Sequence, residues 1–429
     1  MHPSPPSPLV PRPASDGLPT PPRPPSWGEW VQDMFPAVLA GLIAVLISYA
    51  GPFLLVLQAG QAAQLSPAQL NSWIWAISIG AGVCCIWLSW RTKMPVICAW
   101  NSPGAALLVG ALATLPYNQA MGAYIVAAAI MWLVGATGFF ERLVVIIPKS
   151  LCAAMLAGIL LRFGINVFAA TEQGLPGAAA LVGVMFISYL VFKRYSARYA
   201  IVLTLFTGIA LWLTLGWGAV AAPSGAAAGA AEAVWGLTLP VWTTPEFTFS
   251  AIVSVGLPLA VLGLTGQQLP GIAVLRAANY DAPTSRLVSM TGGVSLLLAP
   301  FGAHGINLAA ITAAICTGPE AHPRADRRWV AGVACGVFYL LVGSFAGSLS
   351  YAFMHLPAAL VTTVAGLALL GAIQGGLVNA MQEPTEREAA LVTFLITASN
   401  VTLFGLGSAC WGIVIGVITY LVLRPRRTA

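Results

Sequence analysis

Polar residues interrupt two of the most apolar stretches of the chain, 95-PVICAWNSPGAALL-108 and 300-PFGAHGINLAAITAAI-315. Each stretch begins with residues of extended character, reaches a polar pair and continues with small side chains. Asn101, with a proline two residues later, has the pattern of a helix N-cap, and Asn307 would cap a second helix in the same way. Two helix N-termini aimed at one point would offer N–H groups and positive dipole ends to an anion. The alternative interpretation is a pair of kinked helices whose polar side chains are satisfied within the protein.

Two adjacent amides, Gln267 and Gln268, interrupt the apolar stretch 263-GLTGQQLPGIAVLRA-277. An amide in a membrane interior is unfavourable unless it is hydrogen-bonded. One interpretation makes one of these amides a ligand of a substrate. The other makes both of them hydrogen-bonding contacts between helices.

Two titratable side chains lie within apolar segments, His304 and Arg162. No acidic residue lies deep in such a segment, so His304 is the predicted carrier if a proton crosses through a central side chain. The alternative is a hydrogen-bonding strut. Arg162, in 157-AGILLRFGINVF-168, is costly in lipid and should face protein or water. We interpret it as a gating or anion-attracting residue, with an ion pair to Glu172 as the structural alternative.

The composition restricts the class of protein that can hold these residues. The 429 residues are 58% hydrophobic and only 7% charged, against roughly 25% charged in a soluble domain. The sequence therefore predicts a polytopic membrane protein, and its long unbroken apolar runs predict an all-α one. The basic residues are scattered in small groups between apolar runs, which argues against nucleic acid as a partner. The seven cysteines include no C-x-x-C pair, and neither a P-loop nor paired acids occur, so we expect no metal site, no cofactor and no enzyme.

The apolar runs predict fourteen membrane-spanning segments, in chain order 34–58, 71–90, 95–114, 117–138, 144–169, 176–193, 199–219, 248–275, 285–300, 303–317, 328–349, 357–378, 388–404 and 406–424. With this count, every Lys and Arg except Arg162 falls on the side of the membrane that holds both termini. The positive-inside rule then places both termini in the cytoplasm.

A weak internal repeat accompanies these spans. The stretch 147-IPKSLCAAMLAGILL-161 aligns without gaps on 356-LPAALVTTVAGLALL-370, and 51-GPFLLVLQA-59 aligns on 269-LPGIAVLRA-277. Both alignments relate spans that are seven apart. Because seven is odd, the two halves must have opposite orientations in the membrane, as in the inverted repeats of secondary transporters.

These patterns divide the chain into four parts. Residues 1–28 are rich in proline and serine and are predicted to be a disordered cytoplasmic tail. Residues 30–219 form the first seven-span repeat, and residues 248–424 form the second. Between them, residues 220–247 are predicted to be a periplasmic linker of small residues in which a short interfacial helix would fit.

Several stretches resemble the benzoate/proton symporter family, the BenE family. The resemblance covers essentially all of residues 30–424 and is strongest in PFGAHGINLAAITAAICTGPEAHP (300–323), QQLPGIAVLRAA (267–278), NSPGAALL (101–108), AAMLAGILLRFG (153–164) and EREAALVTFLITAS (386–399).

The resemblance implies uptake of benzoate together with a proton across a bacterial inner membrane. It also implies a distant relation to nucleobase transporters and anion exchangers built from two inverted repeats of seven helices. In that fold a core domain, spans 1–4 and 8–11, moves against a gate domain, spans 5–7 and 12–14. Spans 3 and 10 each carry a short strand and a half-helix, and the substrate lies between them. Relatives often dimerise through the gate domain, so a homodimer stays open here.

The sequence departs from the uracil-type relatives, which place glutamates in spans 8 and 10. Here Gln267 or Gln268 and Ile306 or Asn307 stand near those places. Neutral amides suit an anionic carboxylate better than acids do, so we expect benzoate or a close aromatic carboxylate. A nucleobase or another anion on the same fold is the alternative. A channel and a membrane enzyme fit less well, because the spans show isolated polar points.

The predicted substrate site combines residues from spans 1, 3, 8 and 10: Tyr49, Phe53, Asn101, Ser102, Gln267, Gln268, His304 and Asn307. The amides and helix N-termini would hold the carboxylate. Tyr49, Phe53 and small residues such as Ala309 would contact the ring.

Overall fold

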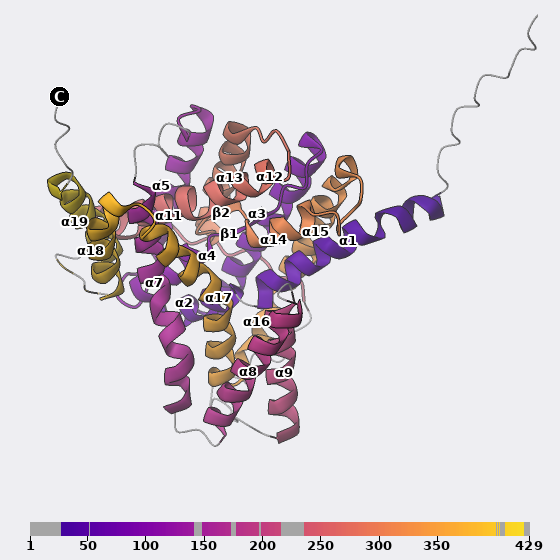
Figure 1. Ribbon diagram of the computed structural model, residues 1–429, viewed down its shortest axis with the longest axis horizontal. Coiled ribbons are helices and arrows are strands. Elements are labelled where there is room, and N and C mark those ends of the chain that lie inside the picture. Colours follow the sequence, from indigo (N-terminus) through magenta and orange to yellow (C-terminus); the bar gives the residue numbers. More distant parts are fainter. Residues whose placement is uncertain are drawn as a thin grey trace, which may run out of the picture.

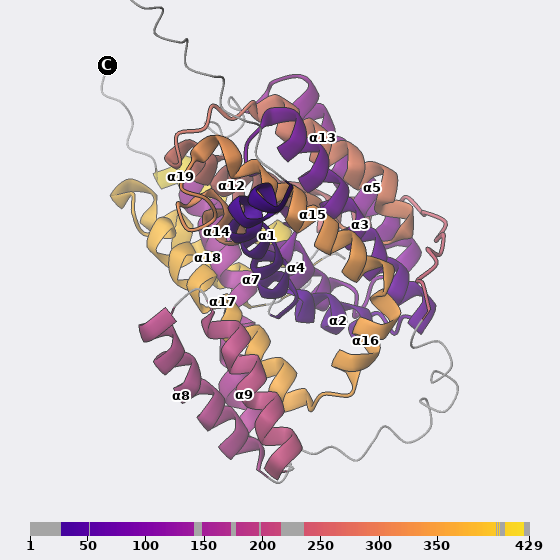
Figure 2. The same ribbon diagram turned by 90° about the vertical axis from the view of Figure 1, so that its right-hand side faces the viewer.

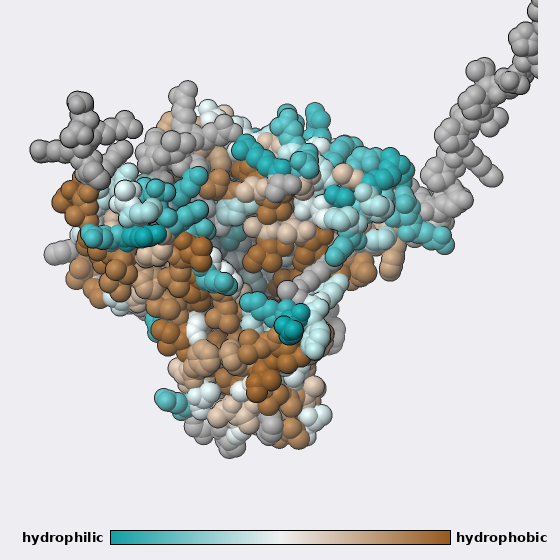
Figure 3. Space-filling view, in the orientation of Figure 1, coloured by the Kyte–Doolittle hydropathy of each residue, from teal (hydrophilic) through white to brown (hydrophobic). Residues whose placement is uncertain are grey.

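The computed structural model describes residues 27–50, 52–140, 148–172, 177–196, 199–215, 236–399, 401, 403 and 408–423. The regular secondary structure of these residues is helical except for one pair of short strands, so the expected all-α polytopic class is confirmed. By length and composition, seven described helices can cross a membrane, or eight if the bent pair α15 and α16 is one span. Apolar side chains dominate the face in Figure 3, with hydrophilic ones gathered mainly along its upper part.

The first half of the chain contains α1 (Trp27–Ala50), α2 (Phe53–Ala62), α3 (Pro67–Thr92), β1 (Cys98–Trp100), α4 (Ser102–Ala111), α5 (Tyr117–Ala136), α7 (Lys149–Ala169), α8 (Ala178–Ser196) and α9 (Ala200–Leu215). The second half contains α10 (Phe249–Ala251), α11 (Leu257–Gly263), α12 (Leu269–Ala277), α13 (Thr284–Leu298), β2 (Ile306–Leu308), α14 (Ile311–Thr317), α15 (Trp329–Ser344), α16 (Ala346–Met354), α17 (Ala358–Ala380), α18 (Arg387–Ala398) and α19 (Ser408–Leu423). Each of the fourteen predicted spans overlaps at least one of these helices.

The helices pack in two groups (Figures 1 and 2). In one group α3 packs on α15, α5 on α13, and α1 on α15 and α14. In the other, α7 packs on α17 and α18, α18 on α19, and α8 on α9 and α17. In Figure 1 the lower ends of α7, α8, α9 and α17 project below the rest of the molecule.

Small residues decide which helices touch, because all faces are apolar and hydrophobicity cannot select a partner in lipid. A Cβ at Gly41 of α1 would lie 2.6 Å from the Ala331 carbonyl oxygen of α15. A Cβ at Gly135 of α5 would lie 2.3 Å from the Ser289 backbone nitrogen of α13. Both helix pairs therefore meet backbone to backbone, which only glycine permits.

The strands β1 and β2 cross antiparallel in the interior, with Ala99 opposite Asn307. Two glycines before β2 require a non-helical chain, since Gly302 has φ +110° and Gly305 has φ +137°. The pairing satisfies backbone groups that lipid could not. Two further hydrogen bonds extend it: Asn101 N–H donates to Gly305 O at 2.9 Å, and Ala309 N–H donates to Ile97 O at 2.9 Å.

Local details differ from the sequence-based expectations at three places. Asn307 lies in β2 and does not cap a helix; α14 begins at Ile311 after Ala310, which makes no side-chain cap. The predicted span 328–349 is instead two helices, α15 and α16, bent by 75°. The predicted span 248–275 contains two π-helical segments, Ile252–Gly256 and Leu264–Gln268.

The predicted tail and linker lie only partly within the described residues. Residues 1–26 are outside them, and Trp27 and Gly28 already belong to α1. Of the linker, residues 220–235 are outside the described residues and residues 236–247 contain no helix. This second part follows the protein surface, since Thr243 N–H donates to Pro300 O at 2.9 Å and Glu246 N–H to Asn118 O at 3.0 Å.

We predict that Gly135→Ala destabilises the protein by about 1–3 kcal/mol, because the new methyl group must separate α5 from α13. The matched control is Gly183→Ala in α8, where an added Cβ meets nothing within 4 Å. The melting temperatures of the two purified variants in detergent check this prediction. Equal melting temperatures would show that the contact between α5 and α13 is not close.

Candidate substrate-binding site

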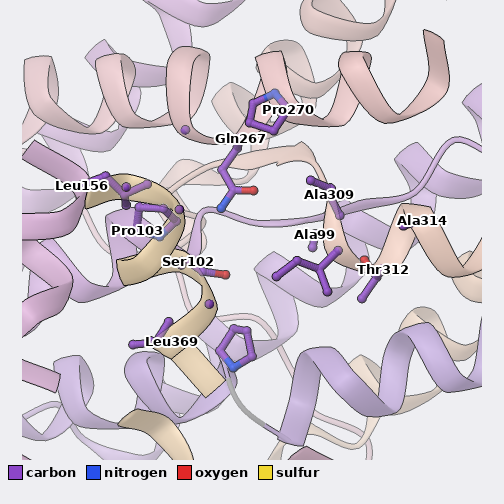
Figure 4. Close-up of a pocket in the computed structure, with 18 of the residues that line it drawn as sticks. Ala99, Ser102, Pro103, Leu156, Gln267, Pro270, Ala309, Thr312, Ala314 and Leu369 are labelled. Carbon is purple, nitrogen blue, oxygen red and sulfur yellow. The ribbon is translucent and has the colours of Figure 1, made fainter. Parts of the chain in front are cut away.

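A cavity of about 1130 Å³ lies where the crossed strands meet the second group of helices. One wall comes from β1, the start of α4, the second π segment and the start of α14. The opposite wall comes from α7 and α17. Apolar residues close most of it, among them Ala99, Pro103, Leu156, Pro270, Ala309 and Leu369 (Figure 4).

Polar side chains from different elements converge on this cavity. Gln267, from the second π segment, and Ser102, at the start of α4, point into the same space, and Thr312 of α14 lies across from them (Figure 4). Trp100 also lines the cavity. Within the described part of the chain, the Trp100 indole N–H and the Thr312 hydroxyl are buried without a hydrogen-bond partner. Buried polar groups are normally paired. Both atoms have almost no exposed surface, so a ligand would reach them only if their side chains turned toward the cavity.

Gln268, next to Gln267, serves a different purpose. It is fully buried, and its amide N–H groups donate to Thr291 Oγ1 at 2.7 Å and to Asn307 Oδ1 at 3.2 Å. Its Oε1 accepts from the Leu308 N–H at 3.4 Å. Gln268 and Asn307 therefore join the second π segment and α13 to β2 behind the cavity wall. Of the two sequence-based interpretations, Gln268 fits the one that makes it a hydrogen-bonding contact between helices. The Asn307 amide nitrogen keeps an N–H without a partner among the described residues.

Asn101 is also buried and supports the start of α4. Its Oδ1 accepts from the Gly104 N–H at 3.0 Å, which confirms the predicted N-cap. Its Nδ2 donates to the Leu259 carbonyl of α11 at 3.3 Å. Asn101 thus fixes the direction in which the neighbouring Ser102 enters the cavity.

His304 supports the paired strands β1 and β2 on the side away from the cavity. The Trp73 indole N–H donates to His304 Nδ1 at 2.9 Å, so the ring proton is on Nε2, which donates to the Asn101 carbonyl at 3.0 Å. The ring is only 2% exposed and also packs edge-on against Trp73, with centroids 5.5 Å apart. In this arrangement His304 is a neutral strut, and a second proton on Nδ1 would break the bond from Trp73.

Tyr49 and Phe53 lie behind Trp100, away from the cavity wall. The ring centroids of Tyr49 and Trp100 are 5.2 Å apart, and those of Phe53 and Trp100 are 6.4 Å apart. The Tyr49 hydroxyl is hydrogen-bonded to Ser78 Oγ at 2.6 Å. The two rings therefore support the Trp100 indole, which is the aromatic side chain on the cavity itself.

Arg162 lies on an exposed face of α7 and does not line the cavity. Ile165, one turn further along the same face, is 56% exposed. Within the described residues Arg162 forms no ion pair, with Glu172 or with any other acid. The proposed pair with Glu172 is therefore absent from this conformation.

Sequence reasoning missed Trp100 and Thr312 as cavity residues. Trp100 lies in an apolar run that gives no sign of a binding site. Thr312 lies in a helix whose start depends on the position of β2. One signal was available: Ser102 and Thr312 each lie at the start of a helix that follows a strand, one in each half of the chain.

At its exposed end the cavity is lined by Lys149, Glu320 and Gln382.

The fold is similar to that of solved membrane-protein structures. The structure resembles that of murine solute carrier 26 member A9, described as an anion transporter in the inward-facing state, with a TM-score of 0.61 and 13% sequence identity over 91% of this chain and 68% of that chain. It also resembles the transmembrane domain of the cyanobacterial bicarbonate transporter BicA, with a TM-score of 0.55 and 13% identity over 92% of this chain and 97% of that chain. These similarities establish the fold.

Sequence comparison establishes the family. Residues 32–422 match the model of the BenE family, described as benzoate membrane transport protein, so the chain belongs to that family. It is 43% identical to inner membrane protein YdcO of Escherichia coli (strain K12) over 91% of this chain and 96% of the relative. It is 42% identical to a benzoate membrane transport protein of Acinetobacter baylyi over the same shares. The protein is a membrane transporter of this family, as the sequence motifs predicted.

Gln267 and Gln268 allow a matched test of the site. We predict that Gln268→Met lowers stability by about 1–3 kcal/mol, because the Leu308 N–H and the Thr291 hydroxyl each lose a buried partner. Gln267→Met should leave stability unchanged, because within the described residues its side chain has no hydrogen bond to lose. Melting temperatures of the two variants check this prediction, and an equal loss in both would contradict the different roles of the two amides.

Proposed function

We propose that this protein carries benzoate, or a closely related aromatic carboxylate, into the cell together with a proton. The observation that carries the proposal is the set of neutral donors around an otherwise apolar cavity. The Ser102 hydroxyl, the Gln267 amide, the Thr312 hydroxyl and the Trp100 indole N–H are all donors. A carboxylate accepts hydrogen bonds only, and such charge-assisted bonds are about twice as strong as neutral ones.

The apolar part of the cavity suits an aromatic ring. Leu156 of α7, Leu369 of α17, Ala99 and Ala309 line the cavity together with the donors (Figure 4). The one carboxylate that lines the cavity within the described residues is Glu320, at the exposed end. A bound anion therefore meets no negative side chain at the donors. The Acinetobacter baylyi relative is named a benzoate membrane transport protein, which agrees with this chemistry.

Transport would proceed by alternating access between two domains. The proposed core contains spans 1–4 and 8–11, and the gate contains spans 5–7 and 12–14, within fourteen spans arranged as two inverted repeats. The two groups of packed helices and the position of the cavity between them support this division. The exposed end of the cavity lies among loops that carry Lys149 and Arg324, on the side that the positive-inside rule assigns to the cytoplasm. The structure would then correspond to an inward-open state in a bacterial inner membrane.

His304 is the proposed proton carrier, and its geometry defines what coupling requires. Protonation would replace the acceptor at Nδ1 by a donor, and Trp73 would have to turn away. The same ring holds the Asn101 carbonyl beside Ser102. Proton binding would thus act on the substrate donors through Asn101. Arg162 would serve as a gating or anion-attracting residue in another conformation, and a homodimer through the gate stays a proposal.

An inorganic or other small anion is the second candidate substrate, because the two solved structures of this fold are named as an anion transporter and a bicarbonate transporter. The apolar lining of the cavity favours an aromatic acid over a small inorganic anion. A nucleobase would lack the acidic partners found in uracil-type relatives.

The proposal is tested by uptake of labelled benzoate into proteoliposomes, with and without an inward proton gradient, after subtraction of passive entry into protein-free vesicles. We predict gradient-stimulated uptake that unlabelled benzoate suppresses and that uracil and sulfate do not. Gln267→Ala and Ser102→Ala should each weaken the apparent affinity at least about tenfold, since each removes a bond to a charged group. Unchanged affinity in both variants would contradict the site, and suppression by sulfate or uracil would contradict the substrate.

A separate prediction concerns His304→Gln. If this ring carries the coupled proton, the variant should lose gradient-driven accumulation of benzoate and keep benzoate exchange at equal pH on both sides. If the ring is only a strut, exchange and accumulation should fall together. Accumulation equal to that of the unmodified protein would exclude His304 as the carrier.

A further inference from the structure

A second hollow lies on the outer face of the molecule, away from the substrate cavity. It is a groove of about 550 Å³ between α3, α5 and α13, which lie side by side in Figure 2. Its lining is apolar apart from one serine and one arginine. The groove residues are Trp87, Leu88, Trp132, Arg286, Ser289, Met290, Gly293, Val294, Leu296 and Leu297.

The floor of the groove is one face of α13. Arg286, Ser289, Gly293 and Leu297 are spaced three or four residues apart, so they form a single stripe along the helix. Gly293 leaves the middle of this stripe without a side chain. An added Cβ there would lie 3.4 Å from Cδ1 of the Trp132 indole, so this ring overhangs the floor.

The groove is open on the surface of the protein. Trp87 and Trp132, in its walls, are 49% and 43% exposed, and Leu297, at the end of its floor, is 74% exposed. Tryptophan is enriched where a membrane protein meets the lipid interface. An apolar channel with such walls fits an acyl chain.

Arg286 stands at the end of the groove with its charge unbalanced. It is exposed, and among the described residues its side chain forms neither an ion pair nor a hydrogen bond. It lies in the first turn of α13, where the helix dipole disfavours a cation. Arg91 of α3 follows Trp87 by four residues and lies on the same helix face, toward the same end. Both arginines fall on the side that carries the basic loops.

We propose that this groove binds one anionic phospholipid of the cytoplasmic leaflet. The phosphate would lie at Arg286, with Arg91 nearby, and one acyl chain would lie along Gly293 between Trp87 and Trp132. Charge complementarity selects the occupant, because basic pockets between membrane helices on this side attract anionic head groups. The inference does not depend on the identity of the transported substrate.

The test is native mass spectrometry of the delipidated full-length protein in detergent, titrated with phosphatidylglycerol or with phosphatidylcholine of the same chains. We expect one phosphatidylglycerol to bind at least tenfold more tightly than phosphatidylcholine. R286Q should lose this preference, and R194Q, which neutralises an exposed arginine at the end of α8, should keep it. G293L should weaken binding by filling the groove while the charge is retained.

Equal binding of the two lipids by the unmodified protein would overturn the proposal, as would an R286Q variant that keeps the full preference. Displacement of the lipid by excess inorganic phosphate alone would also overturn it, since it would show an anion site without a chain site. Each variant is first shown to elute as a single species of the same size as the unmodified protein, so that a loss of binding reports the groove.

Discussion

The backbone pairing of β1 with β2 is the constraint on which the rest of the structure depends. Two stretches of extended chain in a membrane interior have no water to satisfy them, and each supplies the other with partners. This pairing brings residues more than 200 positions apart to one place. It also ends each extended stretch where a helix can begin, at Ser102 in α4 and at Ile311 in α14.

A layered site follows from this crossing. Behind the strands, Asn101, Gln268 and His304 use their hydrogen bonds within the protein and hold the backbone in place. In front of them, Ser102, Gln267 and Thr312 face the cavity. Rigid support behind these donors would allow the proposed carboxylate to bind without a positively charged side chain beside it. The apolar helices α7 and α17 complete the cavity from the other group, so motion between the groups would open or close it.

Much of this arrangement was predictable because it depends on local chemistry. Apolar runs predicted the helices, and the Asn-Ser-Pro pattern predicted the capped start of α4. The position of Asn307 was not predictable, because a strand at 306–308 exists only through its partner far away in sequence. The sequence also could not show which of the two adjacent glutamines, Gln267 or Gln268, faces the cavity. The helical phase there is set by π segments, each of which adds a residue to a turn.

Benzoate is proposed to occupy the cavity in front of the strands. The most direct measurement is the rate at which a water-soluble maleimide alkylates an Ile311→Cys variant, located by mass spectrometry, because Ile311 lines the cavity and is 68% exposed. Benzoate at a concentration that saturates uptake should slow this reaction, because it would cover Ile311→Cys, and sulfate should not. An alkylation rate that saturating benzoate leaves unchanged, in a variant that still transports, would contradict this proposal.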